Sequence, residues 1–460
     1  MGQTTGLGLL DRAAMRVHKA FARVVSAAPR RWELPRSILS TPPSLDAMIE
    51  GCISGSGGEM SARARAASLG LGYVQAPDID KLAFLSTLCE RFGPDMDRVV
   101  ALMHAALAAT NDVERGREIA ALKRALEPPR LDLLRRFSTL PEGIRFFVDM
   151  RADVLRLLPD NPALQVLDKD LKGLLSAWFD LGLLELRQIT WASPAVLLEK
   201  LIAYEAVHAI AGWNDLKNRL DSDRRLFAFF HPRMPDEPLI FVEVALVKGI
   251  AGSVQELLDE SAPVLDPRDA DTAIFYSISS TLRGLAGISF GNFLIKKVVE
   301  RLLSEFPQLT TFSTLSPIPG FRRWLRSIID DGQEHGSFPD GFDAASVEAN
   351  FNAADADGVS LAMEAAESLA AHYLVRIQLK KGRALDPVAH FHLSNGARVE
   401  RINRYGDTSP KGLAQSGGLM VNYLYRLADI EANVDLYTES GAVPVGPAVR
   451  RLLWDMKPPR

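Results

Sequence analysis

The stretch from Thr272 to Leu325 constrains the fold of this chain more than any other part of the sequence. It begins with a compact apolar run, Ala273 to Ile278, whose residue types suit a buried strand. Glycines follow at positions 284, 287 and 291, and the apolar residues after them recur at helical spacing. A second short strand is predicted from Leu309 to Leu315. The order strand, glycine turn, helix, strand predicts a helix that packs on a sheet.

A glycine turn between a strand and a helix is one way to bind a phosphate group. The turn exposes backbone N–H groups and the positive end of the helix, and the missing Cβ atoms let a pyrophosphate approach. However, the glycine spacing does not match GxGxxG, and no Walker-type P-loop sequence is present. The local pattern leaves two interpretations open: a phosphate-binding turn, and a turn that only allows the helix to pack.

Composition narrows the class of protein. With 460 residues the chain is long enough for two or three domains. Its hydrophobic content of 47% and charged content of 24% are those of a globular protein, so disorder is not expected. A net charge of −4 argues against general nucleic-acid binding, which needs a concentrated basic excess. A local basic patch for a phosphate remains compatible with this charge.

The cysteines and the apolar runs bear on the compartment. Cys52 and Cys89 form no metal-binding spacing and no disulfide framework, which favours a reducing compartment. No run of 18 apolar residues occurs, so no membrane span is predicted. The basic N-terminus weakly resembles a transit peptide, but an amphipathic helix from Leu9 to Ala27 explains it better. Since no peroxisomal signal ends the chain, we expect a cytoplasmic protein.

Residues 1–188 are predicted to be almost entirely helical. The segments Asp95–Ala109, Leu131–Leu140, Pro141–Leu158 and Leu164–Leu186 all show a helical period, with prolines at the breaks. This region carries no dense group of histidines, cysteines or acids. We interpret it as a helical bundle with an oligomerisation or supporting role.

The period changes in the second half of the chain. Ser193-Pro194 predicts a helix start, and this helix is expected to run to about Ala211 with Glu205 and His208 on one face. That pair could shuttle protons, but a structural hydrogen bond is the more common role. Strands are predicted from Leu226 to Phe230 and from Leu239 to Val247. Hairpin strands followed by strand, turn and helix predict an α+β domain.

Two histidines stand out near the C-terminus. His390 and His392 are predicted to lie on a strand, Pro387–Ser394, that is joined by Asn395-Gly396 to a second strand. Alternate residues of a strand point to the same side, so both rings would share a face. A metal pair is one interpretation, but no third ligand has a fitting spacing. Two histidines packed in a sheet is the alternative.

Ser316 begins the sequence Ser-Pro-Ile-Pro directly after a predicted strand. The prolines stiffen the chain there, so the hydroxyl is held in place at a strand end, where sites on open sheets form. A serine that only caps a turn fits the local sequence as well. No GxSxG sequence surrounds it, so a hydrolase serine is not indicated.

Several segments together resemble the malonyl-CoA decarboxylase family. They include FYSISSTLRGLAGISFGNFLIKKVV, FSTLSPIPGFRRWL, ITWASPAVLLEKLIAYEAVHAI, PDEPLIFVEVALVKGIAGSVQELL, DPVAHFHLSNGARVERIN and GGLMVNYLY, in the family's order between about residues 189 and 425. The resemblance implies an α+β protein with an N-terminal all-α helical bundle, residues 1–188. It further implies a GNAT-like (N-acetyltransferase-like) α/β catalytic domain, residues 189–460.

The resemblance also assigns roles to individual residues. It implies that Ser316 and His392 are catalytic and that Tyr425 supports them. His390 lies where the family need not have histidine. The substrate-binding turn would comprise Ala286, Gly287, Ile288, Ser289, Phe290, Gly291 and Asn292. Because some members have glutamate in place of Ser289, the side chain at this position is not expected to be essential.

The activity implied by the resemblance is conversion of malonyl-CoA to acetyl-CoA and CO₂. The thioester itself accepts the electrons, so neither a metal nor an organic cofactor is expected. A homo-oligomer, dimer or tetramer, is expected, with no nucleic-acid or membrane partner. Two alternatives share the predicted domain: an acyl-CoA-dependent N-acetyltransferase and a CoA-binding regulator. The Ser316–His392 pair and the order of the segments favour the decarboxylase.

Overall fold

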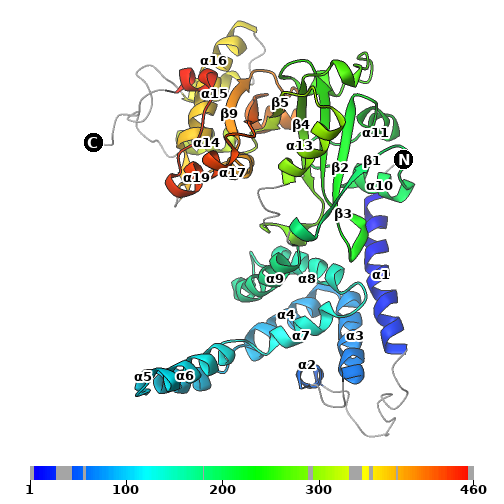
Figure 1. Cartoon of the computed structure of the whole chain (residues 1–460), viewed down its shortest axis with the longest axis vertical. Helices are drawn as coiled ribbons and strands as arrows, with labels where there is room; N and C mark the ends of the chain where they lie inside the picture. Colours follow the sequence, from blue (N-terminus) through cyan, green and yellow to red (C-terminus); the bar gives the residue numbers. More distant parts are fainter. Residues whose placement is uncertain are drawn as a thin grey trace. The chain divides into compact units, whose positions relative to one another are not determined.

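The structure, a computed structural model, describes residues 5–26, 44–54, 59–179, 181–288, 294–330, 344–351, 356–379 and 382–453. The chain forms two compact units, and Figure 1 labels many of their elements. The first comprises Met1–Leu183, His231–Glu237 and Leu282–Ser289, and the second comprises Leu184–Phe230, Pro238–Thr281 and Phe290–Arg460. Helices dominate the first unit and a mixed sheet with helices forms the second, which confirms the predicted α+β class.

The first unit is built from amphipathic helices around an aromatic core. Phe146 lies at the centre of this core, with ring centroids 5.2 Å from Phe21 and 5.0 Å from Phe137. Its α-helices are α1 (Thr5–Ser26), α2 (Leu45–Ile53), α3 (Glu59–Gln75), α4 (Asp78–Arg91), α5 (Met96–Ala108), α6 (Asp112–Ala125), α7 (Arg130–Ser138), α8 (Gly143–Leu157) and α9 (Gln165–Trp178).

A segment distant in sequence, the turn at Gly284, also belongs to this unit. A Cβ at Gly284 would collide with the backbone carbonyl of Val148 on α8, so only glycine allows this approach. Arg151 of α8 is 2% exposed, donates through Nε to Asp168 (2.8 Å) and through a terminal N–H to the carbonyl of Gly284 (2.6 Å). The helical region therefore holds the start of the glycine turn.

The second unit contains an eight-stranded sheet in the order β1-β2-β3-β4-β5-β10-β6, with β9 paired to β10. In Figure 1 strands β2, β3 and β4 run side by side. Strand β4 pairs with β5 in parallel, whereas β10 pairs antiparallel with β5, β6 and β9. The strands are β1 (Glu185–Ile189), β2 (Arg224–His231), β3 (Met234–Val247), β4 (Thr272–Ser280), β5 (Thr311–Thr314), β6 (Ser316–Pro317), β9 (Arg398–Asn403) and β10 (Met420–Tyr425).

Short helices and a small second sheet complete this unit. A two-stranded ribbon pairs β7 (Gln378–Leu379) with β8 (Arg383–Ala384). The helices are α10 (Ala195–Tyr204), α11 (Trp213–Arg219), α12 (Val254–Leu257), α13 (Leu294–Glu305), α14 (Phe321–Asp330), α15 (Ala344–Asn350), α16 (Ala356–Arg376), α17 (Pro387–Ser394), α18 (Pro410–Ser416), α19 (Ile430–Ser440) and α20 (Pro447–Leu452). None of the helices in the described ranges meets the length and apolarity needed to cross a bilayer.

Two predicted helices end earlier than their sequence pattern suggests. The helix predicted over Leu164–Leu186 stops at Trp178, and Glu185–Ile189 forms strand β1, which pairs with β2. The helix predicted to reach Ala211 stops at Tyr204. In both places tertiary pairing or side-chain hydrogen bonds replace further helical turns, which local periodicity cannot register.

The predicted hairpin strand Pro387–Ser394 is wrong, because this segment is the helix α17. Asp386 is its N-cap, Pro387 occupies the first helical position, and the Asp386 side chain accepts from the backbone N–H groups of Val388 and Ala389. Gly396, with φ of +82°, follows the helix end, a position that glycine commonly occupies. Asn-Gly therefore ends a helix here instead of turning a hairpin.

Replacement of Gly396 by alanine should destabilise the protein strongly. A Cβ there would lie 2.5 Å from the carbonyl oxygen of Ile430, in addition to the cost of positive φ. Gly249 is the matched control, since its φ is +73° but nothing lies within 4 Å of its Cβ position. We expect Gly249→Ala to cost about 1 kcal/mol and Gly396→Ala about 1–3 kcal/mol more, measured by urea unfolding. Equal costs would contradict the close contact.

Candidate active site

Hydrogen bonds link the start of helix α17 to the loop that follows Ser316. The buried carboxylate of Asp386 accepts from the backbone N–H of Val388 (2.9 Å) and of Ala389 (3.0 Å). It also accepts from the N–H of Gly320, at the end of the Ser-Pro-Ile-Pro-Gly sequence, at 3.3 Å. One side chain thus fixes the start of the helix that carries His392 against the loop that carries Ser316.

Ser316 and His392 lie within hydrogen-bond distance of each other. Ser316 begins β6, where it pairs with Val421 of β10, and its side chain is buried. The Oγ of Ser316 is 3.1 Å from Nε2 of His392 and 2.9 Å from Oγ1 of Thr314. The structure therefore brings together two residues that are 76 positions apart in the sequence.

Tyr425 extends this pair to a chain of three side chains. The phenol oxygen of Tyr425 is 2.8 Å from Nδ1 of His392, the ring nitrogen that does not contact Ser316. The imidazole also stacks on the ring of Tyr423, with centroids 4.5 Å apart and an angle of 24° between the planes. Both ring nitrogens and one ring face of His392 are thus held by neighbours, which leaves the imidazole little rotational freedom.

Burial keeps these groups uncharged. His392 is completely enclosed, and desolvation lowers its pKa to about 3. Desolvation also raises the pKa of Tyr425 well above its usual value. At neutral pH the site therefore holds a neutral imidazole between a neutral phenol and a serine hydroxyl, a set of groups that can pass or donate a proton.

His390 does not share the surroundings of His392. Two residues along a helix lie on nearly opposite sides, whereas on the predicted strand they would share a face. Nδ1 of His390 is 2.9 Å from the hydroxyl of Tyr437 on α19, and desolvation lowers its pKa. Within the described ranges, no three histidine, cysteine or acidic side chains are grouped as metal ligands would be. The rings of the two histidines therefore have different partners.

Glu205 and His208 do not form the predicted helix-face pair. Glu205 lies just after α10, and its carboxylate accepts from the backbone N–H of His208 (2.8 Å) and from the hydroxyls of Ser277 (2.9 Å) and Ser279 (3.0 Å) on β4. Burial lowers the pKa of His208 to about 4, so its ring is neutral. The carboxylate stabilises the fold locally and does not contact the imidazole by any hydrogen bond in the described residues.

Part of the predicted substrate-binding turn lies within the described residues. Ala286, Gly287 and Ile288 follow the one-turn helix Arg283–Leu285, and Gly287 has φ of +70°. Ser289, Phe290, Gly291 and Asn292 lie outside the described residues. Glycine is required at these two positions for different reasons. Gly284 packs closely against α8, whereas Gly287 adopts a left-handed backbone conformation.

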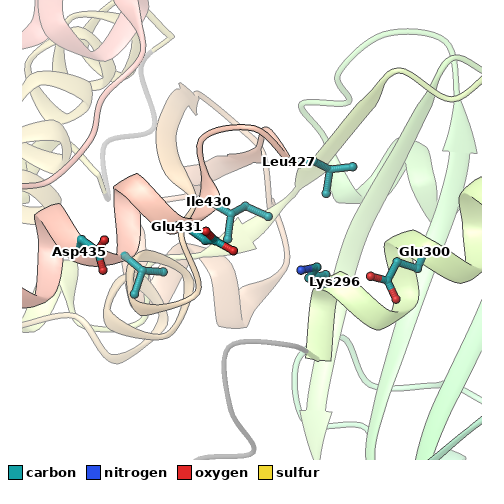
Figure 2. A pocket seen from close by; sticks show the side chains of 7 residues that line it. Lys296, Glu300, Leu427, Ile430, Glu431 and Asp435 are labelled. Atoms are coloured by element: carbon teal, nitrogen blue, oxygen red, sulfur yellow. The ribbon is translucent and has the colours of Figure 1, made fainter.

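A cavity of about 260 Å³ lies between α13 and α19. Figure 2 shows Lys296 and Glu300 of α13 on one side and Ile430 and Glu431 of α19 on the other, with Leu427 nearby. Its carboxylates outnumber its single ammonium, so it suits an uncharged group better than a phosphate. A neighbouring cavity, which shares Leu427, extends along β5 and β10 to Tyr425.

Sequence reasoning missed three residues that shape this site. Thr314 contacts Ser316, and Tyr423 stacks on His392. Nothing in the local sequence of either residue indicates a role in the site. Asp386 could have been found, because aspartate before proline is a helix-start signature. That signature would also have placed His392 on a helix.

Family models match most of the chain. The model for the malonyl-CoA decarboxylase C-terminal domain matches residues 182–460, and the model for the N-terminal domain matches residues 92–179. Among curated proteins, the malonyl-CoA decarboxylase, mitochondrial, of Anser anser anser is 37% identical over 77% of this chain and 76% of that protein. The protein of the same name from Mus musculus is 38% identical over 77% of this chain and 78% of its own length.

Solved structures agree with the family models. The crystal structure of malonyl-CoA decarboxylase from Rhodopseudomonas palustris matches with a TM-score of 0.83 and 46% identity, covering 89% of this chain and all of that one (100%). The enzyme from Agrobacterium vitis gives a TM-score of 0.81 and 41% identity, covering 89% of this chain and 99% of that one. On these matches, the chain belongs to the malonyl-CoA decarboxylase family.

Proposed function

We propose that this chain converts malonyl-CoA to acetyl-CoA and CO₂. The observation that carries the proposal is the buried hydrogen-bonded chain Ser316–His392–Tyr425 in a member of this family. Decarboxylation of a malonyl thioester needs a held carboxylate, an electron sink and a proton for the α-carbon. The thioester is the sink, because the electrons of the broken C–C bond enter its carbonyl group to form an enolate.

The three side chains fit the remaining two requirements. Ser316 holds or polarises the carboxylate that leaves as CO₂. His392 then protonates the α-carbon of the enolate through Nε2, while Tyr425 supplies a proton to Nδ1. The enolate of a thioester is a far stronger base than a phenolate, so this transfer runs downhill even though the imidazole starts neutral. Solvent restores the phenol proton after the reaction.

We also propose that the turn from Ala286 to Asn292 binds the phosphates of CoA. Gly287 has a left-handed backbone conformation, and Nζ of Lys172 lies 3.4 Å from where a Cβ at Gly287 would stand. A lysine ammonium beside an exposed backbone turn is a common phosphate site.

Two other expectations stay proposals. No metal or organic cofactor is needed for the electron flow described above. Cytoplasmic localisation stays a prediction, and the curated relatives from Anser anser anser and Mus musculus are named as mitochondrial. The N-acetyltransferase and CoA-binding regulator are not favoured, because the family assignment rests on both halves of the chain.

The first test is the reaction with single-residue variants. Wild-type protein with malonyl-CoA should give acetyl-CoA and CO₂ by mass spectrometry, and a chelator should leave the rate unchanged. Ser316→Ala and His392→Asn should each lower kcat by roughly 10²–10⁴, the range for a positioned acid, base or oxyanion donor. His390→Asn is the matched control, because that ring contacts Tyr437 instead of Ser316.

Several outcomes would contradict this assignment. A His390→Asn variant as inactive as His392→Asn, with both folded, would remove the basis for choosing His392. Activity that disappears in chelator and returns with a divalent ion would disprove the metal-free reaction. Acetyl transfer from acetyl-CoA to amines, without CO₂ release from malonyl-CoA, would support the acetyltransferase instead.

The low pKa of His392 should appear in the pH dependence of stability. In the unfolded chain its imidazole binds a proton near pH 6.5, but in the folded protein only near pH 3. Between these values the unfolded state holds more protons, so stability falls as the pH drops below 6.5. Urea unfolding from pH 6.5 to 5.0 should show that His392→Asn reduces this slope by up to about 1.4 kcal/mol per pH unit.

His208 and His372 also contribute to the pH dependence of the stability. Burial lowers the pKa of each to about 4, so both maintain part of the slope in the variant. A slope identical to that of the wild type would mean that His392 titrates normally in the folded protein. Such a result would contradict the neutral, enclosed imidazole on which the proposed proton transfer rests.

We propose that residues 1–188 assemble subunits of a homo-oligomer, dimer or tetramer. Helices α5 and α6 pack on each other, and α5 exposes an apolar stripe. Met96, Val100, Met103 and Leu107 recur at helical spacing with exposed fractions of 60%, 43%, 43% and 76%. An apolar stripe of this kind is typical of a face that another helix covers.

Charge on this stripe should lower the number of subunits. Met103→Glu with Leu107→Glu is expected to reduce the mass measured by light scattering without lowering the midpoint of thermal unfolding, because both side chains are already exposed. Ala105→Glu adds a charge to the same helix away from the stripe and should change nothing. An unchanged mass in the double variant would assign these helices a supporting role only.

A further inference from the structure

Thr314 lies where the pairing of β5 and β10 is interrupted. The two strands pair at Ser313 with Leu424, and β6 resumes the pairing at Ser316 with Val421. Between these points the backbone N–H of Tyr423 donates to the side-chain Oγ1 of Thr314 at 3.1 Å. A buried threonine hydroxyl thus replaces a backbone carbonyl in the ladder.

Side chains also satisfy the other backbone groups at this point. Nδ2 of Asn422 donates to the carbonyl of Thr314 at 2.7 Å, and the hydroxyl of Ser313 donates to the carbonyl of Tyr423 at 3.2 Å. Asn422, Ser313 and Thr314 are all completely buried. The hydroxyl of Thr314 is therefore fixed from the β10 side, two residues before Ser316 and on the same side of the chain.

The directions of the hydrogen bonds follow from Tyr425. Its buried phenol keeps its proton, and in the described residues its partner is Nδ1 of His392. A buried hydroxyl donates where it can, so the phenol proton points at Nδ1. The neutral imidazole then carries its own proton on Nε2 and donates it to Oγ of Ser316. Ser316 must donate onward, and the acceptor at 2.9 Å is Oγ1 of Thr314.

We propose that Thr314 is a positioning residue for the decarboxylation proposed above, on which this inference rests. As the last acceptor of the hydrogen-bonded chain Tyr425–His392–Ser316–Thr314, it points the proton of Ser316 away from the imidazole until a substrate carboxylate accepts that proton in its place. Nε2 of His392 is thereby kept in its protonated form, ready to donate. The N–H of Tyr423 occupies one acceptor site of the threonine oxygen and leaves the other for Ser316.

Loss of this acceptor should reverse the direction of the hydrogen bonds between Ser316, His392 and Tyr425. Without the threonine hydroxyl, the proton of Ser316 can be satisfied only by donation to Nε2 of His392. The ring proton would then move to Nδ1 and point at the oxygen of Tyr425, which leaves the phenol proton without an acceptor. The imidazole would present a lone pair to the substrate in place of a proton, and the step that protonates the α-carbon would slow.

The test compares Thr314→Val, which has nearly the same shape, with Thr314→Ser, which keeps the hydroxyl. We expect the valine variant to lose roughly 10- to 100-fold in kcat with little change in KM, and the serine variant to recover most of the loss. Nitrogen-15 NMR of histidine-labelled protein should show the ring proton of His392 on Nε2 in the wild type and on Nδ1 in the valine variant. His392→Asn identifies the signal among the eight histidines.

Ser313→Ala is the matched control, because it removes a buried hydroxyl from the same ladder without touching Ser316. It should lower kcat far less than Thr314→Val does, and it should leave the histidine tautomer unchanged. If the valine variant does not fold, Thr314→Cys replaces it, because a thiol is a far weaker acceptor than a hydroxyl. Wild-type kcat or an unchanged tautomer in a folded variant without the hydroxyl would overturn the role of Thr314. A wild type that releases no CO₂ would overturn the proposed function instead, and the tautomer would still decide the hydrogen-bond direction.

Discussion

The geometry of the candidate active site depends on the carboxylate of Asp386. It accepts hydrogen bonds from backbone N–H groups in the first turn of α17 and from the N–H of Gly320. It thereby links two segments that are 66 positions apart in the sequence. Without this joint, nothing in the local sequence would place the imidazole of His392 against the serine hydroxyl. The carboxylate is itself buried, which raises its pKa, and the N–H donors oppose that effect. The N-cap residue of α17 therefore also holds this helix against the loop that carries Ser316.

Burial of the His392 side chain limits the reactions that this site could catalyse. A solvent-exposed histidine would be partly charged near neutral pH and would act as a conventional acid. His392 is instead neutral, stacked on Tyr423 and within hydrogen-bond distance of a partner at both nitrogens, so only a strong base can take its proton. A carbanion-like enolate is a base strong enough to take such a proton, whereas weaker bases are not. Burial of these groups is thus compatible with the proposed reaction, which generates a strong base beside them.

The sequence predicted the elements with long, regular patterns and missed those that depend on distant partners. The helical first region, the strands β2, β3 and β4 and the α+β class follow from periodicity and are confirmed. The fold around His392 was predicted wrongly, because Asn-Gly serves both a hairpin turn and a helix end. The roles of Ser316, His392 and Tyr425 came from family resemblance, and their mutual distances could come only from the structure. Thr314 carried no local signal, since its importance arises from a gap in strand pairing.

The turn at Gly284 has a consequence for how this protein can be divided. Its backbone lies against Val148 and accepts a hydrogen bond from Arg151, so residues far along the chain complete the helical unit. A cut at residue 188 therefore separates the glycine turn from the helix that it contacts. A fragment cut at residue 188 would expose the glycine segment without the helix that receives it. A helical fragment would keep this contact only if it carried the turn as well.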